Sequence, residues 1–524
     1  MVRAFLAASF LAAAFLPNAY AAEPVVVAQR NTFERPSASL TPDWVGRLEK
    51  AMSSDKTVEA MIEYRSMASA SPSQRERVQS AEDARAEVSG PKTDILAFLA
   101  FENVEILQVF EYQPLIRVRL SNTQAQKLAE RPDVVNVHLE EFFERKEMSA
   151  SELLRFEKST LEAPITDDAK PQLNPEYVNA DKAWAKGFQG QGFSVAFLDD
   201  GINAQPEMFQ GKIRGEACFS NANGKGDNLC PFGTTTASGL GTASGQCSTQ
   251  TDICGHGSHV AGIAVGNNRG SIFVAKGVAP EGGVVPIQVF HRNRGTDNCT
   301  GGATTCITSS SFDLASALDW VIANATRYNI AAVNMSLGSG TYSTYCDSQT
   351  ILASGINTLR KMNVLTAIAA GNDGDLGVVS HPGCIRNAVT VSSTIITVPD
   401  SNVNHAPLVD LLAPGYLVYS ALGTGSASYG TKTGTSMATP YVAGAIAVLK
   451  SAIPSATADQ IEYAMVATGT LVDYIGWTWK TPRLDVNAAI GLLGATPPPQ
   501  GIALVGLVSS RNALTKRWPG ESGQ

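Results

Sequence analysis

Between residues 173 and 495, short apolar runs with strand character alternate with longer segments of helical periodicity. Strands are predicted at residues 193–199, 284–290, 330–337, 364–370, 388–393 and 409–412, and helices near 257–266, 311–328, 347–362, 438–452 and 457–467. Parallel strands need such crossover helices, and near-continuous apolar strands indicate burial on both faces of a sheet. We therefore predict an α/β fold with a mostly parallel sheet flanked by helices.

Two polar residues follow predicted strands of this region. Asp199 ends an apolar run at residues 195–198, and Asn372 follows the segment Ala369-Ala370-Gly371. Functional sites of such sheets gather at the carboxyl ends of the strands. We therefore expect Asp199 and Asn372 to belong to one site, although an Asn-Asp-Gly sequence can also simply close a turn.

Ser436 lies in the segment Gly434-Thr435-Ser436-Met437-Ala438-Thr439-Pro440, directly before a long apolar run, so its hydroxyl is expected near a helix N-terminus. A serine hydroxyl stays protonated at neutral pH unless a base takes its proton and a third group orients that base. His256 and Asp199 can fill these two roles, with Asp200 as the competing carboxylate. The sequence thus contains the parts of a serine nucleophile.

These motifs, in the order Asp, His, Asn, Ser, resemble those of the subtilisin-like serine proteases. The resemblance implies a subtilisin-like fold and a secreted serine endopeptidase with Ser436 as nucleophile. His256 is then the general base and acid, and Asp199 is the carboxylate that orients it. Asn372 and the Ser436 backbone N–H are the implied oxyanion donors.

The resemblance also implies where substrate binds. One segment pairs with the substrate backbone as an added strand, and it corresponds to Ser336, Leu337 and Gly338. With Ala369, Ala370 and Gly371 it walls the pocket for the residue before the cleaved bond. These walls are small and apolar, so protein and peptide substrates with apolar or aromatic side chains are expected there. No catalytic cofactor is implied. Structural Ca²⁺ is common in the family, but no ligand set with a readable spacing appears, so no metal site is assigned.

The N-terminal third has a different composition. Residues 23–170 hold 19 Lys and Arg and 26 Asp and Glu in 148 positions, whereas residues 171–524 hold 20 and 22 in 354. Strands are predicted at 57–65, twice within 103–120 and at 134–139, and helices at 92–101 and from 121 or 122 to about 130. The order βαββαβ predicts a small α+β ferredoxin-like unit at residues 57–146.

This unit resembles the inhibitory propeptide of the subtilases, whose C-terminal extension occupies the active-site cleft. An unrelated small charged domain is the alternative. The polar residues 22–56 are expected to form a loose leader. Residues 147–172 are expected to be the processing junction, in which the cleaved bond cannot be identified. Autocatalytic release of the propeptide follows from the resemblance.

The two ends of the chain indicate export and further processing. Arg3, an apolar core from Phe5 to Leu16 and the segment Ala19-Tyr20-Ala21 predict a secretory signal peptide at residues 1–21. A membrane anchor is the alternative, but the apolar core is shorter than a bilayer span. The segment 496–524 begins as a Pro-rich linker and ends in a short tail that cannot build a core of its own.

The net charge is −8 with a sequence pI near 5.4, and no cluster of Lys and Arg appears. We therefore expect no nucleic-acid partner. After signal removal we expect no membrane association and a monomer whose own propeptide is its intramolecular inhibitor.

The eight cysteines all lie between residues 218 and 384. An even number in an exported domain favours disulfides, and neighbours in sequence are the natural partners. The expected pairs are Cys218 with Cys230, Cys247 with Cys254, Cys299 with Cys306, and Cys346 with Cys384, although other pairings stay open. A zinc site is the alternative, but no Cys-x-x-Cys pair exists.

Two rival functions are considered. A binding protein that kept the fold without catalysis is disfavoured by the complete set of Asp199, His256, Ser436 and Asn372. A hydrolase of esters or lipids is disfavoured because Ser436 lies in Gly-Thr-Ser-Met-Ala rather than in a Gly-x-Ser-x-Gly elbow.

Overall fold

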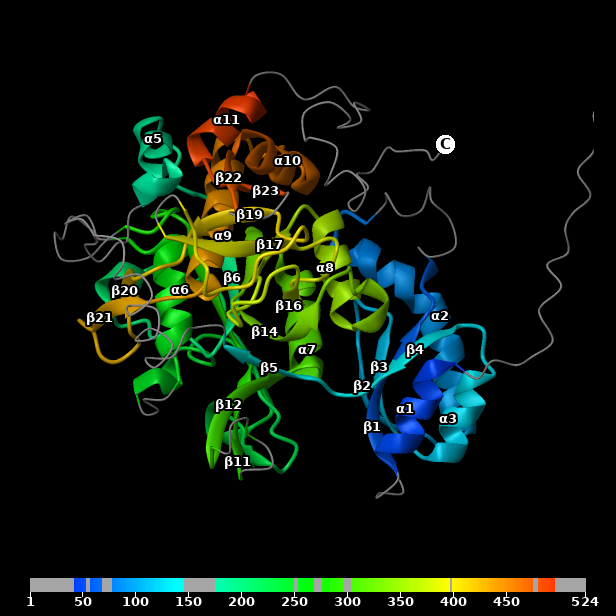
Figure 1. Ribbon diagram of the computed structural model, residues 1–524. Coiled ribbons are helices and arrows are strands. Elements are labelled where there is room, and N and C mark those ends of the chain that lie inside the picture. The colour runs from blue at the N-terminus through cyan, green and yellow to red at the C-terminus, as the bar shows by residue number, and fades with distance from the viewer. Residues whose placement is uncertain are drawn as a thin grey trace, which may run out of the picture. The chain divides into compact units, whose positions relative to one another are not determined.

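The computed structural model of the protein is shown in Figure 1. It describes residues 42–52, 57–67, 78–145, 175–248, 253–267, 276–295, 299, 303–395, 398–474 and 479–494. The predicted signal peptide, processing junction and C-terminal tail lie outside these described residues. Residues 22–41 of the predicted leader also lie outside them. The described residues belong to one unit, which begins at Pro42.

A large sheet forms the centre of the C-terminal part, in the order β22-β23-β19-β17-β15-β13-β6-β10-β7-β9, with β18 paired to β17. The strands are β6 (Ser194–Asp199), β7 (Ala217–Phe219), β9 (Thr236–Ser238), β10 (Gly283–Gln288), β13 (Ile330–Met335), β15 (Leu365–Ala369), β17 (Val389–Ile395), β18 (Val398–Pro399), β19 (Leu411–Pro414), β22 (Thr470–Asp473) and β23 (Lys480–Arg483). All neighbours from β23 to β7 pair in parallel. The predicted mostly parallel sheet is therefore confirmed.

Helices cover both faces of this sheet. One face carries α6 (Gly255–Val265), α9 (Thr435–Ala452), α10 (Ala458–Thr468), α11 (Val486–Gly494) and the short α5 (Ala180–Ala185), and the other carries α7 (Ser311–Asn324) and α8 (Leu352–Lys361). Side chains of β6 alternate between the two cores. Val195 and Phe197 pack with α6 and α9, while Ala196 and Leu198 pack with α7. The apolar run of β6 is thus explained by burial on both faces.

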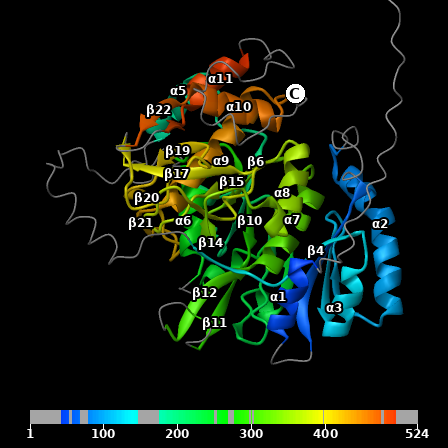
Figure 2. The same ribbon diagram turned by 45° about the vertical axis from the view of Figure 1, so that its right-hand side comes forward.

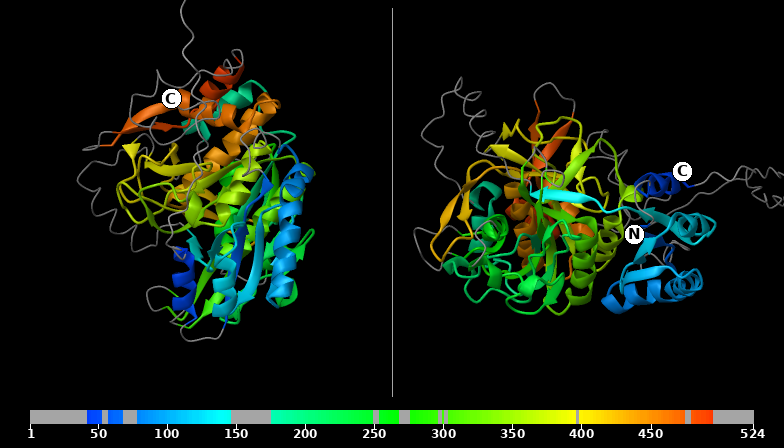
Figure 3. Two further views of the ribbon diagram at one scale, coloured as in Figure 1. Left: turned by 90° about the vertical axis from the view of Figure 1, so that its right-hand side faces the viewer. Right: turned by 90° about the horizontal axis from the view of Figure 1, so that it is seen from below.

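The N-terminal unit is a second, smaller fold. Its four strands are β1 (Val58–Tyr64), β2 (Glu105–Val109), β3 (Leu115–Leu120) and β4 (Val134–His138), in the antiparallel order β2-β3-β1-β4. Helix α2 (Ala81–Phe101) connects β1 to β2, and α3 (Asn122–Ala129) connects β3 to β4. The predicted βαββαβ order is therefore present, and the sheet order is that of a ferredoxin-like unit. Figure 3 shows this unit in blue and cyan.

Two predictions for this region are wrong. Residues 43–51 were expected in a loose leader but form helix α1 (Asp43–Ala51), which buries Trp44 and Leu48 against the unit. Helix α2 begins at Ala81 rather than residue 92, because the hydroxyl of Ser80 accepts a hydrogen bond from the backbone N–H of Asp83 and caps it. The interior Pro91 concealed this helix in the sequence, since proline usually ends one.

The two faces of the small sheet serve different cores. On β1, Ala60 and Ile62 pack into the unit's own core, which includes residues of α1, α2 and α3. Met61 points the other way and packs with residues of α7 in the core of the larger part. Figure 2 shows α7 and α8 between the large sheet and the N-terminal unit. The small sheet therefore docks on these two helices.

A single strand continues from the N-terminal unit into the larger part. Strand β5 (Phe142–Arg145) lies between β14 (Leu337–Tyr342) and β12 (Thr305–Ser310), antiparallel to both. Their sheet has the order β16-β14-β5-β12-β11-β8 and is completed by β16 (Val379–His381), β11 (Phe290–Arg294) and β8 (Gly226–Asp227). Residues distant in sequence thus form one sheet around β5.

All four expected disulfides are present: Cys218–Cys230, Cys247–Cys254, Cys299–Cys306 and Cys346–Cys384. Two of them lie in the Gly- and Ser-rich segment before α6. Helix α8 starts at Leu352 instead of the predicted residue 347, since residues 347–349 form a separate 3₁₀ turn and the Thr350 hydroxyl accepts a hydrogen bond from the N–H of Leu352. A short hairpin of β20 (Val418–Ala421) and β21 (Tyr429–Lys432) precedes α9.

Among the described residues, none of the helices combines the length and apolar character needed to cross a membrane.

Candidate active site

Asp199 and His256 are brought together at the carboxyl edge of the large sheet. Asp199 is the last residue of β6, and His256 is the second residue of α6. Both side chains are almost completely buried. The Nδ1 atom of His256 lies 2.8 Å from Oδ1 and 3.0 Å from Oδ2 of Asp199. The structure therefore places the Asp199 carboxylate, and not that of Asp200, against the imidazole ring.

Asp200 has a different set of partners. Its Oδ1 accepts a hydrogen bond from the backbone N–H of Gly257 at 2.8 Å, and its Oδ2 accepts one from that of His256 at 3.4 Å. The Nη1 atom of Arg145 lies 2.8 Å from the same Oδ2. Burial and the nearby charge of Asp199 raise the pKa of Asp200, while Arg145 acts against that rise. Asp200 thus binds the N-terminus of α6 and a side chain of β5.

Ser436 is the second residue of α9, and α9 packs directly on α6. Its hydroxyl donates a hydrogen bond to the carbonyl oxygen of Ser336 at 3.2 Å, and the hydroxyl of Ser336 donates one to the carbonyl oxygen of Ser436 at 2.9 Å. Ser336 directly follows β13, the parallel neighbour of β6. Ser436 and Asp199 are thus held at the carboxyl ends of adjacent strands.

Asn372 lies beyond the end of β15, next to the start of α9. Its side-chain oxygen accepts hydrogen bonds from the backbone N–H and the hydroxyl of Thr435, both at 2.9 Å. The amide is therefore oriented by its oxygen, and Nδ2 is buried without a hydrogen-bond partner among the described residues. A buried donor of this kind is rare unless a ligand completes it. The Asn372 side chain is thus held by its oxygen at the start of α9, while its nitrogen keeps its donor capacity.

The segments expected to bind substrate are already occupied by β5. Arg145 pairs with Leu337, and Glu144 pairs with Gly338. On the other side of β5, Phe143 pairs with Ser309. Phe143 is completely buried, with its ring centroid 5.1 Å from that of His381. The backbone of Leu337 and Gly338 can therefore pair with an extended chain, as it does here with β5.

The remaining expected wall residues lie where β15 ends. Ala369, Ala370 and Gly371 are all buried, and Gly371 has a φ of +115°. A Cβ atom at Gly371 would come within 2.4 Å of the side-chain nitrogen of Asn404. Glycine is therefore required at this turn, which brings the next residue, Asn372, to the start of α9.

The sequence analysis did not predict β12, the strand that pairs with the other edge of β5. Ser309 and Ser310 of β12 pair with Phe143 and Phe142, but nothing in the polar segment 305–310 marked it as a strand beside a site. The one available signal is Ser310, whose hydroxyl caps α7 by accepting a hydrogen bond from the N–H of Asp313. That signal predicts the helix start but not the pairing.

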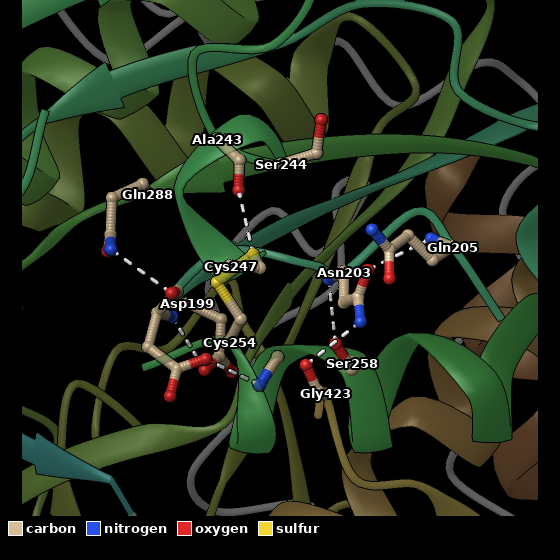
Figure 4. Close-up of a disulfide and its surroundings, with 12 residues drawn as sticks. Asp199, Asn203, Gln205, Ala243, Ser244, Cys247, Cys254, Ser258, Gln288 and Gly423 are labelled. Carbon is tan, nitrogen blue, oxygen red and sulfur yellow. Dashed lines mark hydrogen bonds between the residues drawn. A yellow bond between two sulfur atoms is a disulfide. The ribbon is translucent and has the colours of Figure 1, made fainter. Parts of the chain in front are cut away.

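A disulfide supports the start of α6 (Figure 4). Cys254 immediately precedes α6, has a left-handed φ of +66° and is bonded to Cys247. Its backbone N–H donates a hydrogen bond to the carbonyl oxygen of Asp200 at 3.0 Å, and the Gln288 side chain donates to the same oxygen at 3.1 Å. The loop before His256 is therefore joined both to its disulfide partner and to the end of β6.

Within the described part of the chain, no group of three or more His, Cys, Asp or Glu side chains is arranged to hold a metal ion.

The structure places Asp199, His256 and Ser436 at the carboxyl edge of one parallel sheet, with Asp199 against the imidazole ring of His256 and the Ser436 hydroxyl on the Ser336 carbonyl. Comparison with models of protein families matches residues 190–488 to the model described as the Subtilase family. The chain belongs to the subtilase family, and it is a serine endopeptidase.

Relatives of known kind agree with this assignment. A thermostable alkaline protease of Halalkalibacterium halodurans is 30% identical over 395 residues, which cover 74% of this chain and 84% of the relative. Subtilisin Savinase of Lederbergia lenta is 33% identical over 300 residues, 56% of this chain and 89% of the relative. An extracellular serine proteinase of a Thermus species is 31% identical over 283 residues, 54% of this chain and 56% of the relative.

Proposed function

We propose that the protein hydrolyses peptide bonds through an acyl-enzyme formed on Ser436. His256 takes the proton of the Ser436 hydroxyl and then gives it to the leaving amine, and Asp199 orients the ring. The observation that carries this proposal is the contact of Asp199 with Nδ1 of His256 at 2.8 and 3.0 Å. A carboxylate there holds the ring proton on Nδ1, which leaves Nε2 as the base.

Asn372 supplies one of the two donors for the negative oxygen that forms on the attacked carbonyl, and the backbone N–H of Ser436 supplies the other. The support is the buried Nδ2 atom without a partner among the described residues and the two hydrogen bonds from Thr435 that hold the amide oxygen. A donor positioned in advance stabilises the charge without reorganisation. Leu337 and Gly338 bind the substrate backbone, and Ser336 with Ala369, Ala370 and Gly371 forms the wall for an apolar side chain.

The N-terminal unit is the propeptide and inhibitor of the same chain. Support comes from β5, which occupies the strand position between β14 and β12 and so excludes another chain from it. The proposed propeptide domain keeps its predicted bounds of 57–146, and helix α1 is proposed to belong to it because α1 packs with this unit. The other bounds remain predictions: the processing junction at 147–172, the catalytic domain at 173–495 and the tail at 496–524.

Export to the cell exterior or periplasm is proposed from the predicted signal peptide at residues 1–21 and from relatives whose names include an extracellular proteinase. Protein and peptide substrates are proposed on the family assignment. The mature enzyme is proposed to be a monomer that requires no catalytic cofactor, and structural Ca²⁺ stays unassigned.

The test is Ser436→Ala expressed in a host strain that lacks other exported proteases. The change removes one oxygen atom and no core packing, so the protein should fold. Without the nucleophile only about 10³- to 10⁴-fold acceleration over water remains, so the uncut proform should accumulate. Wild type should give a shorter species and should be labelled by a fluorophosphonate. Intact mass spectrometry and labelling provide the two readouts.

Ser451→Ala is the matched control, because Ser451 lies on the same helix near its other end. It should mature and be labelled as wild type. Maturation of Ser436→Ala at the wild-type rate would contradict self-cleavage, and wild-type peptidase activity in that variant would contradict the assignment of the nucleophile.

A further inference from the structure

Phe142 and Phe143 are neighbours in β5, but their side chains have different surroundings. Successive residues of a strand face opposite sides of its sheet. Phe143 is completely buried and packs in a core of the catalytic domain. Phe142 is only partly buried and faces the other side of the sheet. The ring of Phe142 therefore contacts a part of the domain that Phe143 does not.

Two side chains of the catalytic domain contact the Phe142 ring. The ring of His291, on β11, is nearly perpendicular to it, with an interplanar angle of 81° and ring centroids 6.0 Å apart. The ammonium nitrogen of Lys225 lies 5.4 Å from the Phe142 ring centroid. Aromatic pairs favour a perpendicular arrangement, and a cation within about 6 Å of a ring centroid is attracted by the π electrons. The Nε2 atom of His291 lies 3.1 Å from the hydroxyl of Thr308, which helps to fix the imidazole ring.

The backbone around Lys225 is fixed by a disulfide and by β11. The bridge Cys218–Cys230 closes the loop that carries Lys225. The carbonyl oxygen of Lys225 accepts a hydrogen bond from the N–H of Arg294 at 2.9 Å. The next residue, Gly226, must be glycine, because a Cβ atom there would come within 1.7 Å of a backbone oxygen of β11. Lys225 is therefore held beside β11 while its side chain stays exposed.

The charge of Lys225 is not neutralised by the domain. Asp227, two residues further along, pairs instead with Arg292 at 3.0 Å and with Arg294 at 2.6 Å. Among the described residues, no carboxylate forms an ion pair with Lys225. When the N-terminal unit leaves with Phe142, the ammonium group and the imidazole ring of His291 remain in the domain. They can then contact the side chain of a substrate.

The pairing of β5 fixes the position of Phe142 relative to the reacting serine. Strand β5 is antiparallel to β14, with Arg145 opposite Leu337. The next residue in this register lies opposite Ser336, whose carbonyl oxygen accepts the hydrogen bond of the Ser436 hydroxyl. A chain that follows β5 therefore presents that residue to the nucleophile. Counted back from the bond that follows it, Phe142 corresponds to the fifth residue before the cleaved bond.

We propose that Lys225 and His291 form a subsite that selects an aromatic side chain at the fifth residue before the cleaved bond. The inference rests on the proposed function, because substrates are taken to follow the path of β5. An aliphatic side chain of the same size would cover the ammonium group without offering it an electron-rich face. A carboxylate would attract Lys225 but would lose the ring pair with His291.

The test uses three peptides with the sequence of residues 140–149, which carry phenylalanine, cyclohexylalanine or glutamate at the position that corresponds to Phe142. Cyclohexylalanine keeps the size and apolar character of phenylalanine but has no π electrons. With mature wild-type enzyme, kcat/KM should be about 5- to 20-fold higher for the phenylalanine peptide than for the cyclohexylalanine peptide, and the glutamate peptide should also be poorer. Mass spectrometry of the products should place the cut four residues after the varied position.

Lys225→Met should lower the ratio of kcat/KM for phenylalanine over cyclohexylalanine about 2- to 5-fold, because methionine is unbranched but uncharged. Lys225→Arg should keep the ratio, since it keeps the cation. The ratio within each enzyme is the readout, because it cancels any general change in activity. Lys276→Met is the matched control: the same substitution removes a cation that lies 5.4 Å from the ring centroid of Trp184 on α5, and the ratio should stay as in wild type.

Three results would each overturn the inference alone: equal kcat/KM for the phenylalanine and cyclohexylalanine peptides in wild type, an unchanged ratio in Lys225→Met, or a preference for the glutamate peptide. A cut at any other bond would also overturn it, because the varied residue would then not be the fifth. A wild-type enzyme that cleaves neither these peptides nor any protein substrate would overturn the proposed function instead. Because Lys225 is exposed, its variants should fold.

Discussion

The N-terminal unit and the catalytic domain are stabilised in different ways. The domain has extensive cores on both faces of a parallel sheet, and all four disulfides lie within it. The N-terminal unit has one small core, no cysteine and salt bridges such as Arg119 with Glu59 and Glu105. Half-exposed ion pairs contribute little to stability, so the small unit has fewer resources of its own.

The small unit therefore depends on contacts with the domain. Gln113 is completely buried, and its amide donates a hydrogen bond to the carbonyl oxygen of Ala315 in α7 and accepts one from the hydroxyl of Ser354 in α8. Asp319 of α7 accepts hydrogen bonds from the backbone N–H groups of Glu111 and Tyr112. Further polar contacts join the two parts, among them those of Gln108 with Ser316 and of Glu87 with Lys361. The catalytic domain is therefore stabilised by its own cores and disulfides, whereas the N-terminal unit is stabilised in part by its contacts with the domain.

Removing a disulfide of the catalytic domain should have the largest effect on the difference in stability between the two parts. The bridge Cys346–Cys384 closes a separation of 38 residues, and Cys299–Cys306 closes one of 7. The loop-entropy relation gives a loss of about 4 kcal/mol for the first bridge and about 2 kcal/mol for the second when both cysteines are changed to serine. Urea unfolding in a Ser436→Ala background, which prevents self-digestion, measures both. An equal or inverse order of the two losses would contradict the entropic explanation.

Asn372→Leu should sharpen the comparison because its main effect is on catalysis, although loss of the two hydrogen bonds from Thr435 should also lower stability by about 1–3 kcal/mol. The kcat should fall roughly 10²- to 10³-fold, about 2.7–4 kcal/mol, with little change in KM; this magnitude is the one known for subtilisin, a relative of this chain. Steady-state kinetics on a peptide substrate measure it. Asn487→Leu is the control, since the Asn487 side chain contacts Lys186 at the surface. Full activity of Asn372→Leu would show that the oxyanion donor is another group.

Gln113→Ala should have the smallest effect and should act on the N-terminal unit alone. Loss of its hydrogen bonds to α7 and α8 should weaken docking by about 1–2 kcal/mol. After self-cleavage, the unit should therefore leave roughly 10-fold faster, which shortens the lag before peptide hydrolysis reaches full rate. Gln126→Ala, on the exposed side of α3, should keep the wild-type lag. Identical lags for both variants would show that Gln113 does not anchor the unit.

Periodicity in the sequence was sufficient for the main elements of the domain. The run ending at Asp199 is a buried strand, and the run after Ser436 is the buried helix α9, as predicted. In both cases the side chains that pack are neighbours in sequence with a regular repeat. Disulfide partners were also predicted well, because three of the four loops are short. Helix α1 was missed because its apolar stripe covers only two turns.

Motif order likewise placed Asp199, His256, Asn372 and Ser436 at one edge, since each follows a strand or starts a helix whose type was readable. The choice between Asp199 and Asp200 was different. Both carboxylates are adjacent in sequence, and only the direction in which β6 ends decides which of them meets the imidazole ring of His256.

The sequence by itself thus determined most elements of the domain and the order of the site motifs, and it favoured the local disulfide pairs, because these depend on residues close together in the chain. Tertiary structure decided that Arg145 meets Asp200, that Phe143 pairs with Ser309, and that Gln113 enters between α7 and α8. These contacts join residues far apart in sequence. Local periodicity cannot predict these contacts, because they form only when the small sheet has docked and β5 has paired on both of its edges.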